Sequence, residues 1–188
     1  MSAADPLYAS ARGVVAGWEP RTDAETATRD AFLAALAAGP AVLRRDGPPS
    51  HLTASAFVFD TRRSHVLLCF HRKGLFWVQP GGHLEAGDRS IEGAALRELL
   101  EETGLGPEVL RDVRIADLDH HALGSGFGRC ASHLDIGVAG IADRSVADAE
   151  LVVSDESEAV AWWPIGALPP DAAPRLADRI DAVLVRLG

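Results

Sequence analysis

The sequence is poor in cysteine, with Cys69 and Cys130 the only two among 188 residues. Two cysteines cannot build the disulfide framework that stabilises small secreted domains. Cys69 lies in the apolar segment VLLCF, which predicts a buried thiol. No run of 18 or more apolar residues occurs, which excludes a membrane-spanning helix. The first 20 residues lack a basic start followed by an apolar block, so we expect no secretory signal, no membrane partner and a cytoplasmic location.

Basic residues are also scarce, because 18 Lys and Arg face 27 Asp and Glu and give a formal net charge of -9. Lysine occurs once, at Lys73. A general nucleic-acid-binding protein needs a basic surface to neutralise phosphates, and this composition argues against that class. A phosphorylated small substrate remains compatible, since divalent cations can bridge it to an acidic site.

The length suits one domain with a sizeable core. Thr22 and Glu25 have capping-box spacing and open a predicted helix over residues 22–38. Further helices are expected from Asp88 to Gly104 and from about Ala173 onward. Strands are expected at residues 53–60, 65–71, 75–79, 113–120, 132–142 and 158–164, and residues 80–88 are expected to form a loop. This order predicts a mixed β-sheet covered by helices, an α/β or α+β domain. We expect residues 1–50 to be a helical extension packed on a domain of residues 51–188.

Three glutamates crowd the end of the second predicted helix, where residues 97–104 read RELLEETG. Glu98 has like charges at i+3 and i+4. On an exposed helix each such pair destabilises the helix by roughly a few tenths of a kcal/mol. One interpretation is a solvated helix face on which Arg97 partly neutralises Glu101. The other is a site for hard cations such as Mg²⁺, which prefer oxygen ligands.

The segment that contains these glutamates, residues 80–105 (PGGHLEAGDRSIEGAALRELLEETGL), resembles the Nudix box of the MutT-like Nudix hydrolases. In that family the box runs glycine, five residues, glutamate, seven residues, then Arg-Glu-apolar-any-Glu-Glu-any-Gly-apolar. Gly82 matches the first glycine, and residues 97–105 match the whole tail. The middle departs, because the expected glutamate is Asp88 and eight residues separate it from Arg97. We interpret this as a one-residue insertion. The flanking segments 53–60, 71–83 and 156–168 also fit the order of the family's strands.

The resemblance implies an α/β/α sandwich and hydrolysis, dependent on Mg²⁺ or Mn²⁺, of a pyrophosphate bond in a nucleoside diphosphate-linked or nucleoside triphosphate small molecule. In such a reaction water would attack one phosphorus, and the metals would polarise phosphoryl oxygens. The resemblance also implies that Glu98, Glu101 and Glu102 are catalytic metal ligands assisted by a carbonyl of Gly81 or Gly82. Arg97 would orient the carboxylates. The general base varies within the family and is assigned to none of them.

Other charged residues are candidates for the same site. An acidic loop before the last predicted strand offers a further metal ligand, and Glu156 is our choice over Asp155 and Glu158; the alternative is a solvated acidic loop. Candidate substrate contacts are Arg72, Lys73, His83, His133 and Asp135. Arg72 and Lys73 also fit an ordinary surface cluster at the end of a hairpin.

The histidines of the later strands suggest zinc only superficially. His120, His121, His133 and Asp135 do not have the spacing of a closed structural zinc site, and we interpret them as lining a substrate cleft, with ordinary strand histidines as the alternative. The glycine-rich residues 124–128 join two predicted strands and are expected to be a hairpin tip rather than a phosphate loop.

Two other functions remain open. One is a nucleotide or nucleotide-sugar binding module without hydrolysis, although such modules tend to lose box glutamates. The other is an isopentenyl-diphosphate isomerase-like enzyme, which this sequence disfavours because its loop lacks the cysteine segment of those enzymes. ADP-ribose, nucleotide sugars, oxidised nucleoside triphosphates and CDP-alcohols are all possible substrates. The apolar N-terminal helix is compatible with a homodimer.

Overall fold

The computed structural model describes residues 5–124, 126, 128–144, 151–153 and 157–188. Its helices are α1 (Pro6–Ala16), α2 (Asp23–Ala37), α3 (Ile91–Thr103) and α5 (Leu176–Leu187). Its strands are β1 (Ser50–Asp60), β2 (His65–His71), β3 (Phe76–Val78), β4 (Gly81–His83), β5 (Leu110–Ala122), β6 (Ser132–Ala142) and β7 (Ser157–Pro164). Short 3-10 helices occur at Pro40–Leu43, Pro107–Val109 and Ile165–Ala167. The predicted order of helices and strands is confirmed, with α1 and β4 added to it.

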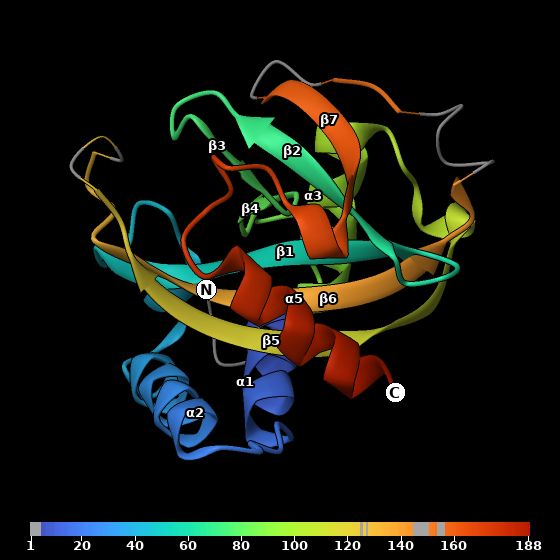
Figure 1. Cartoon of the computed structure of the whole chain (residues 1–188). Coiled ribbons are helices and arrows are strands. Elements are labelled where there is room, and N and C mark those ends of the chain that lie inside the picture. The colour runs from blue at the N-terminus through green and yellow to red at the C-terminus, as the bar shows by residue number, and fades with distance from the viewer. Residues whose placement is uncertain (1–4, 125, 127, 145–150, 154–156) are drawn as a thin grey trace.

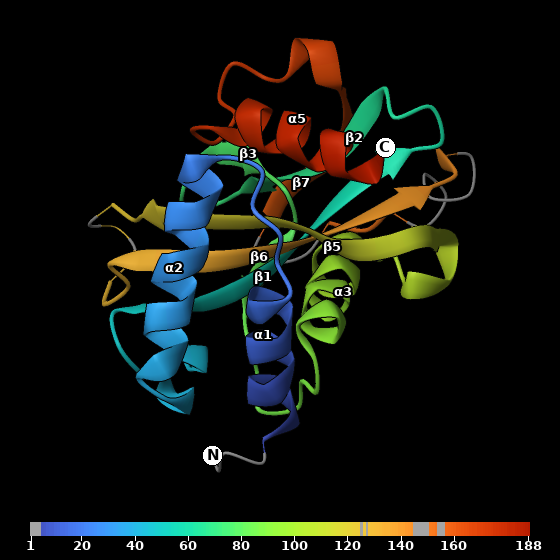
Figure 2. The same cartoon turned by 90° about the horizontal axis from the view of Figure 1, so that it is seen from below.

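The strands form one mixed sheet, which confirms the predicted α/β class (Figure 1). The main path runs β3-β2-β1-β6-β5, while β4 pairs with β1 and β7 pairs with β2. β1 and β6 are parallel, and the other pairs are antiparallel. Helices α1 and α3 lie on one side of β1, β6 and β5, and α5 lies on the other (Figure 2).

Strand β1 is covered on both faces, and alternate residues point to opposite helices. Ala56 and Val58 pack with Leu99 of α3, whereas Phe57 and Phe59 pack with α5. We call these two sides of the sheet the α3 face and the α5 face. Burial on both faces explains why residues 56–59 of β1, AFVF, read as a continuous apolar run rather than an alternating one. Cys69 of β2 is buried, as predicted.

The N-terminal region contains two helices rather than the single one predicted. Helix α2 is capped by Thr22, whose Oγ1 accepts a hydrogen bond from the Glu25 N–H (3.1 Å), as its sequence indicated. Helix α1 begins with Pro6 after the cap Asp5, a start signal that the sequence analysis overlooked. The Ser10 hydroxyl of α1 accepts a bond from the Ile91 N–H (3.1 Å) at the start of α3. The boundary at residue 50 and a homodimer remain predictions.

Helix α3 begins at Ile91 rather than at Asp88, which corrects the prediction. Ser90 is the cap, because its Oγ accepts a bond from the Gly93 N–H (3.0 Å). Asp88 instead accepts a bond from the Glu85 N–H (2.8 Å) and pairs with Arg97. The helix ends at Gly104, whose φ of 78° lies in the left-handed region.

Among the described residues, no helix combines the length and hydropathy required to cross a membrane.

Residues 81–83 were predicted to be loop but form the short strand β4, which is a second correction. β4 pairs antiparallel with β1, placing Gly81 opposite Ser55, Gly82 opposite Ala54 and His83 opposite Thr53. A Cβ at Gly81 would lie 2.5 Å from the Ser55 Cβ, so glycine permits this close approach of the two strands. The glycines that suggested a loop therefore allow a strand.

Candidate functional site

Two of the three glutamates turn toward β4. The Glu102 Oε2 accepts a hydrogen bond from the Gly81 N–H (2.9 Å), and Glu102 is buried. Both carboxylate oxygens of Glu98 lie 2.8 Å from where a Cβ at Gly82 would stand. Glycine at position 82 thus leaves space for the Glu98 carboxylate against the strand. The Glu98 side chain is 14% exposed and that of Glu101 is 55% exposed, so Glu101 lies at the outer edge of the group.

Arg97 ties this carboxylate group together. Its Nη1 donates to Glu98 Oε1 (3.0 Å) and to Glu101 Oε2 (2.9 Å), and its Nε donates to Asp88 Oδ1 (3.0 Å). Its Nη2 donates to the His83 carbonyl (3.0 Å), which links α3 to β4. The hydrogen bond with Asp88 and the charge of Glu98 raise the pKa of Arg97 above its ordinary value, against an opposing effect of burial. The predicted contact between Arg97 and Glu101 is present, and one guanidinium fixes the directions of three carboxylates.

The α5 face carries a buried charge network that includes one of the predicted substrate contacts. Asp135 Oδ1 accepts a bond from Thr53 (2.9 Å) and its Oδ2 accepts bonds from Ser55 (2.6 Å) and Arg179 (2.7 Å). Arg179 also donates to Asp117 Oδ2 (2.8 Å). The carboxylate oxygens of Asp135 are therefore engaged by groups of the protein itself.

Electrostatics set the charge state of this network. Burial raises the pKa of Asp117 above its ordinary value, more than the charge of Arg179 lowers it. For Asp119, burial alone would raise the pKa, but the hydrogen bond with His121 and the charge of Arg179 outweigh it and the pKa falls. Arg179 was not among the predicted site residues, although an arginine within the apolar stripe of the last helix is a signal for a buried charge.

The remaining candidates occupy different places. Arg72 and Lys73 lie in the turn between β2 and β3, and Arg72 Nε is 3.9 Å from Glu158 Oε1. His83 and His133 lie on the α5 face, close to each other, with ring centroids 5.2 Å apart. Glu156 and Asp155 lie outside the described residues, as do Ser125 and Phe127 of the glycine-rich segment. The roles assigned to Arg72, Lys73, His83, His133, Asp135 and Glu156 remain predictions.

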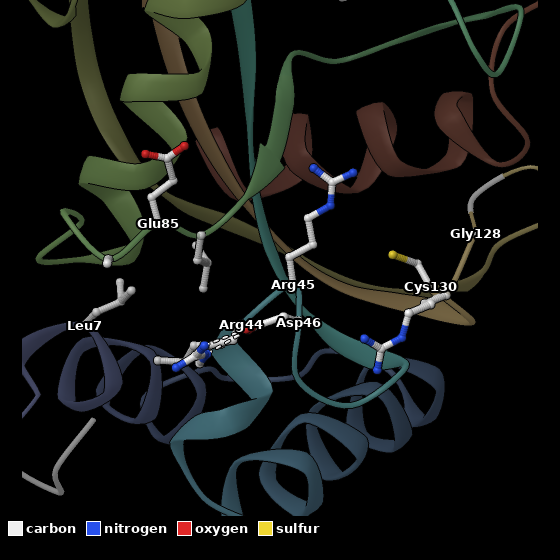
Figure 3. A pocket seen from close by; sticks show the side chains of 11 residues that line it. Leu7, Arg44, Arg45, Asp46, Glu85, Gly128 and Cys130 are labelled. Atoms are coloured by element: carbon white, nitrogen blue, oxygen red, sulfur yellow. Dashed lines mark hydrogen bonds and ion pairs between the residues drawn. The ribbon is translucent and has the colours of Figure 1, made fainter.

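A pocket of about 700 Å³ lies beside the segment that joins β4 to α3 (Figure 3). Leu84 and Glu85 of that segment line it, together with Arg44, Arg45 and Arg129. The described residues that line it do not include Glu98, Glu101 or Glu102. The pocket therefore adjoins the carboxylate group without containing it, and its arginines suit an anionic ligand.

Comparisons with known proteins identify the family. The NUDIX domain family profile matches residues 49–183. The chain is 56% identical over 48 residues to the m7GpppN-mRNA hydrolase NUDT17 of Xenopus laevis, a match that covers 26% of this chain and only 15% of that protein.

Two solved structures share the fold. The NUDIX domain of Shewanella oneidensis NrtR, complexed with ADP ribose, has a TM-score of 0.57 and 20% identity over 73% of this chain and 88% of that one. A Caenorhabditis elegans Ap4A hydrolase binary complex has a TM-score of 0.59 and 15% identity over 72% and 96% of the two chains. The fold, the carboxylate group on α3 and the family match agree, and this chain belongs to the Nudix family.

Proposed function

We propose that this protein is a divalent-metal-dependent hydrolase that cleaves a pyrophosphate bond in a nucleoside diphosphate-linked or nucleoside triphosphate small molecule. One observation carries the proposal: Glu98 and Glu102 are held against the glycines of β4, while Arg97 bonds Glu98, Glu101 and Asp88 together. A solvated helix face would leave these carboxylates apart and exposed. Here two of them are turned inward toward a backbone that only glycine allows so close.

The donor set fits Mg²⁺ or Mn²⁺. Carboxylate oxygens and backbone carbonyls are the hard ligands that Mg²⁺ prefers, and the ion retains sites for water and substrate phosphate. Glu98, Glu101 and Glu102, with the Gly82 carbonyl, would hold the cation, and Glu156 is a further candidate ligand. When bound, the ion polarises phosphoryl oxygens and lowers the pKa of water.

The chain's own residues would position the reaction. Arg97 holds the carboxylates in fixed directions through charge-assisted hydrogen bonds. The glycines of β4 allow the approach of Glu98 and Glu102 to the strand. Arg72 and Lys73 are proposed to contact substrate phosphate. His83, His133 and Asp135 remain candidate substrate contacts, with side chains on the α5 face, across β4 from the carboxylate group. Asp135 would act by positioning, since Thr53, Ser55 and Arg179 engage its oxygens.

The alternatives have less support. A binding module without hydrolysis would not need Glu98 and Glu101 bound to one arginine and Glu102 bound to the Gly81 N–H. The NUDIX domain of NrtR, which is similar in fold, is described in complex with ADP ribose, so binding without turnover stays the second candidate. An isomerase of the isopentenyl-diphosphate type requires an accessible cysteine at the site. Cys69 is buried, and Cys130 lies outside the box segment.

Hydrolysis of a substrate panel tests the proposal. The panel holds ADP-ribose, nucleotide sugars, oxidised nucleoside triphosphates and CDP-alcohols with Mg²⁺, and products are identified by mass. The Glu101→Gln, Glu102→Gln double variant should lose on the order of 100-fold or more in turnover. Replacing a residue that only orients metal ligands already reduces metal affinity or activity roughly 10- to 100-fold. Glu108→Gln is the matched control and should keep full activity. Full activity in the double variant would overturn the assignment, and calorimetric binding without turnover would favour the binding module.

A further inference from the structure

Four side chains with metal-binding atoms meet on the α5 face, away from the carboxylate group. They are His51 of β1, His83 of β4, His133 of β6 and Cys130, which precedes β6. Their ligand atoms all lie within 4.8 Å of one another. The rings of His51 and His83 are 5.1 Å apart between centroids, and those of His51 and His133 are 5.2 Å apart. These residues are dispersed in the sequence and converge only in the fold.

The strand register brings these side chains to one face. His51 lies directly opposite His133 in the parallel β1–β6 pair, so their side chains share a face. His83 lies opposite Thr53 in the β1–β4 pair, and Thr53 is on the same face as His51. Cys130 is positioned by its neighbour Ala131, whose N–H donates to the Pro49 carbonyl (2.8 Å). Adjacent Gly82 belongs to the α3 face, so the histidine–cysteine group and the carboxylate group lie on opposite sides of β4.

The histidines present buried nitrogens that lack partners. His51 is 1% exposed, and its Nδ1 lies 3.0 Å from the Pro48 carbonyl, which leaves Nε2 as the lone-pair atom. Among the described residues, the Nε2 atoms of His51 and His133 are buried without any hydrogen-bond partner. The Nε2 of His83 is 4.0 Å from the Cys130 Sγ. Buried polar atoms without partners are rare and costly, and an imidazole held by a carbonyl at its other nitrogen is the usual arrangement around a metal ion.

Burial disfavours the protonated form of two of these rings. Burial, then the charges of Arg45 and His51, lower the pKa of His83 to about 4. Burial is the largest cause that lowers the pKa of His133 to about 3, and the charge of His83 is the next largest. A neutral imidazole is the form that binds metals.

We propose that His51, His83, His133 and Cys130 bind one zinc-like transition-metal ion, separate from the hard-cation site on α3. Three imidazoles and a thiolate form a borderline-soft tetrahedral set that suits Zn²⁺ and not Mg²⁺. Tetrahedral zinc with Zn–N bonds of ~2.0 Å and a Zn–S bond of ~2.3 Å places its ligand atoms ~3.3–3.6 Å apart. The observed group needs a contraction of about an ångström, within the reach of side-chain rotation. On binding, the Cys130 thiol releases its proton to solvent, and the Sγ–metal bond replaces the S–H bond.

The surroundings give this ion an entry path and a role. Cys130 lines the pocket beside the box segment, so the group borders an open space (Figure 3). The bound ion would join β1, β4 and β6, strands that backbone hydrogen bonds already hold side by side. Because the His83 carbonyl accepts a bond from Arg97, the ion would also stabilise the strand against which Glu98 and Glu102 pack.

Metal content of the full chain tests this proposal directly. The purified protein is equilibrated with Zn²⁺, freed of weakly bound metal and measured by mass spectrometry, and a second sample receives Co²⁺ for absorption spectroscopy. We expect about one zinc per chain, and a sulfur-to-cobalt charge-transfer band alongside the bands of tetrahedral Co²⁺. Less than a tenth of a zinc per chain together with no charge-transfer band would overturn the proposal, and this result does not depend on any variant folding.

Variants then assign the ligands. Cys130→Ser should remove the charge-transfer band, and His133→Gln should weaken zinc binding at least tenfold, with folding checked by circular dichroism. His120→Gln is the matched control, because the His120 Nε2 bonds the Ser132 hydroxyl (3.0 Å) outside the group, and its zinc binding should not change. Glu98→Gln should also retain full zinc, which separates this proposal from the proposed hydrolysis. Unchanged zinc binding and an unchanged cobalt spectrum in both ligand variants would place the metal elsewhere and refute the proposal.

Discussion

The two faces of β4 differ in the chemistry that they gather. On the α3 face, hard carboxylate oxygens come from three glutamates, Glu98, Glu101 and Glu102, within five consecutive positions of one helix. On the α5 face, imidazole nitrogens and a thiol come from His51, His83, Cys130 and His133, which lie on separate strands and a connecting segment. The first group suits Mg²⁺ and phosphate, and the second suits zinc. One short strand can therefore serve two metal chemistries, because successive residues of a strand face opposite ways.

The largest expected effect concerns the buried charges of the α5 face. Arg179→Met would leave Asp117, Asp119 and Asp135 without their buried counter-charge and should cost about 3–5 kcal/mol of unfolding free energy. Urea unfolding at pH 7 measures this. Arg175→Met is the matched control, because Arg175 pairs with Asp119 at 3.1 Å but is 61% exposed, and its loss should cost about 1 kcal/mol or less. Equal costs would show that the buried network contributes no more than a surface pair.

The pH dependence of stability sharpens that result. In the wild type the folded pKa of Asp119 is lowered, so its contribution is present above the unfolded pKa of ~3.9 and is lost as the pH falls through the folded value. Without Arg179, burial dominates and raises the aspartate pKa values above the unfolded ones. The pKa of Asp117 is already raised in the wild type, so between pH 7 and pH 5 the Arg179→Met variant should gain more stability than the wild type. Urea midpoints across this range decide the matter, and parallel pH profiles would contradict the account.

The next prediction changes the carboxylate group on the α3 face and leaves the histidine–cysteine group on the α5 face unchanged. Glu98→Gln should reduce metal-dependent turnover on the order of 100-fold or more, which corresponds to about 2.7 kcal/mol of transition-state stabilisation. Steady-state hydrolysis of the best panel substrate measures it. Glu92→Gln, in the exposed first turn of the same helix, is the control and should keep turnover within about twofold. A full-rate Glu98→Gln enzyme would exclude the carboxylate as a ligand.

A smaller effect tests the fit of β4 against α3. Gly82→Ala would bring a methyl group to 2.8 Å from the Glu98 carboxylate, and that side chain would have to move. We expect turnover to fall about tenfold while the protein remains folded. Gly87→Ala is the control, since nothing lies within 4 Å of its added Cβ, and it should leave turnover unchanged. Equal rates in the two variants would mean that the Glu98 position tolerates displacement.

The smallest effect concerns the start of α3. Ser90→Ala removes the N-cap and should cost about 1 kcal/mol of unfolding free energy. Thr22→Ala removes the corresponding cap of α2 and should cost a similar amount. Only the first change should also reduce turnover, because α3 carries the glutamates. Chemical unfolding combined with a hydrolysis assay separates the two, and equal turnover in both variants would uncouple the α3 terminus from the site.

Much of the fold could be predicted because its signals are local. Thr22 and Gly104 mark helix ends through capping and left-handed backbone geometry that short sequence windows reveal. β6 was predicted with its observed bounds, and residues 136–142 of it form one apolar segment. Errors arose where one residue served another purpose. Asp88 is a residue type that often caps helices, but here it pairs with Arg97. The glycines of β4 suggest a loop, but they permit β4 to approach β1 closely as a strand.

The two sites differ in predictability for the same reason. The glutamates lie one turn apart on a helix, so spacing alone places them together. The grouping of His133 with His51 depends on the register of a parallel strand pair, which no local pattern encodes. In the sequence, His133 lies nearest His120 and His121, whose spacing does not predict a zinc site. The structure instead groups His133 with His51, His83 and Cys130. Tertiary pairing, rather than residue type, was the missing information.

Anomalous diffraction from a crystal soaked in both Mn²⁺ and Zn²⁺ tests the central claim most directly. Data collected at the two absorption edges distinguish the ions. The account predicts manganese among Glu98, Glu101, Glu102 and the Gly82 carbonyl, and zinc among His51, His83, His133 and Cys130. Carboxylates surrounded only by ordered solvent at saturating manganese would contradict it.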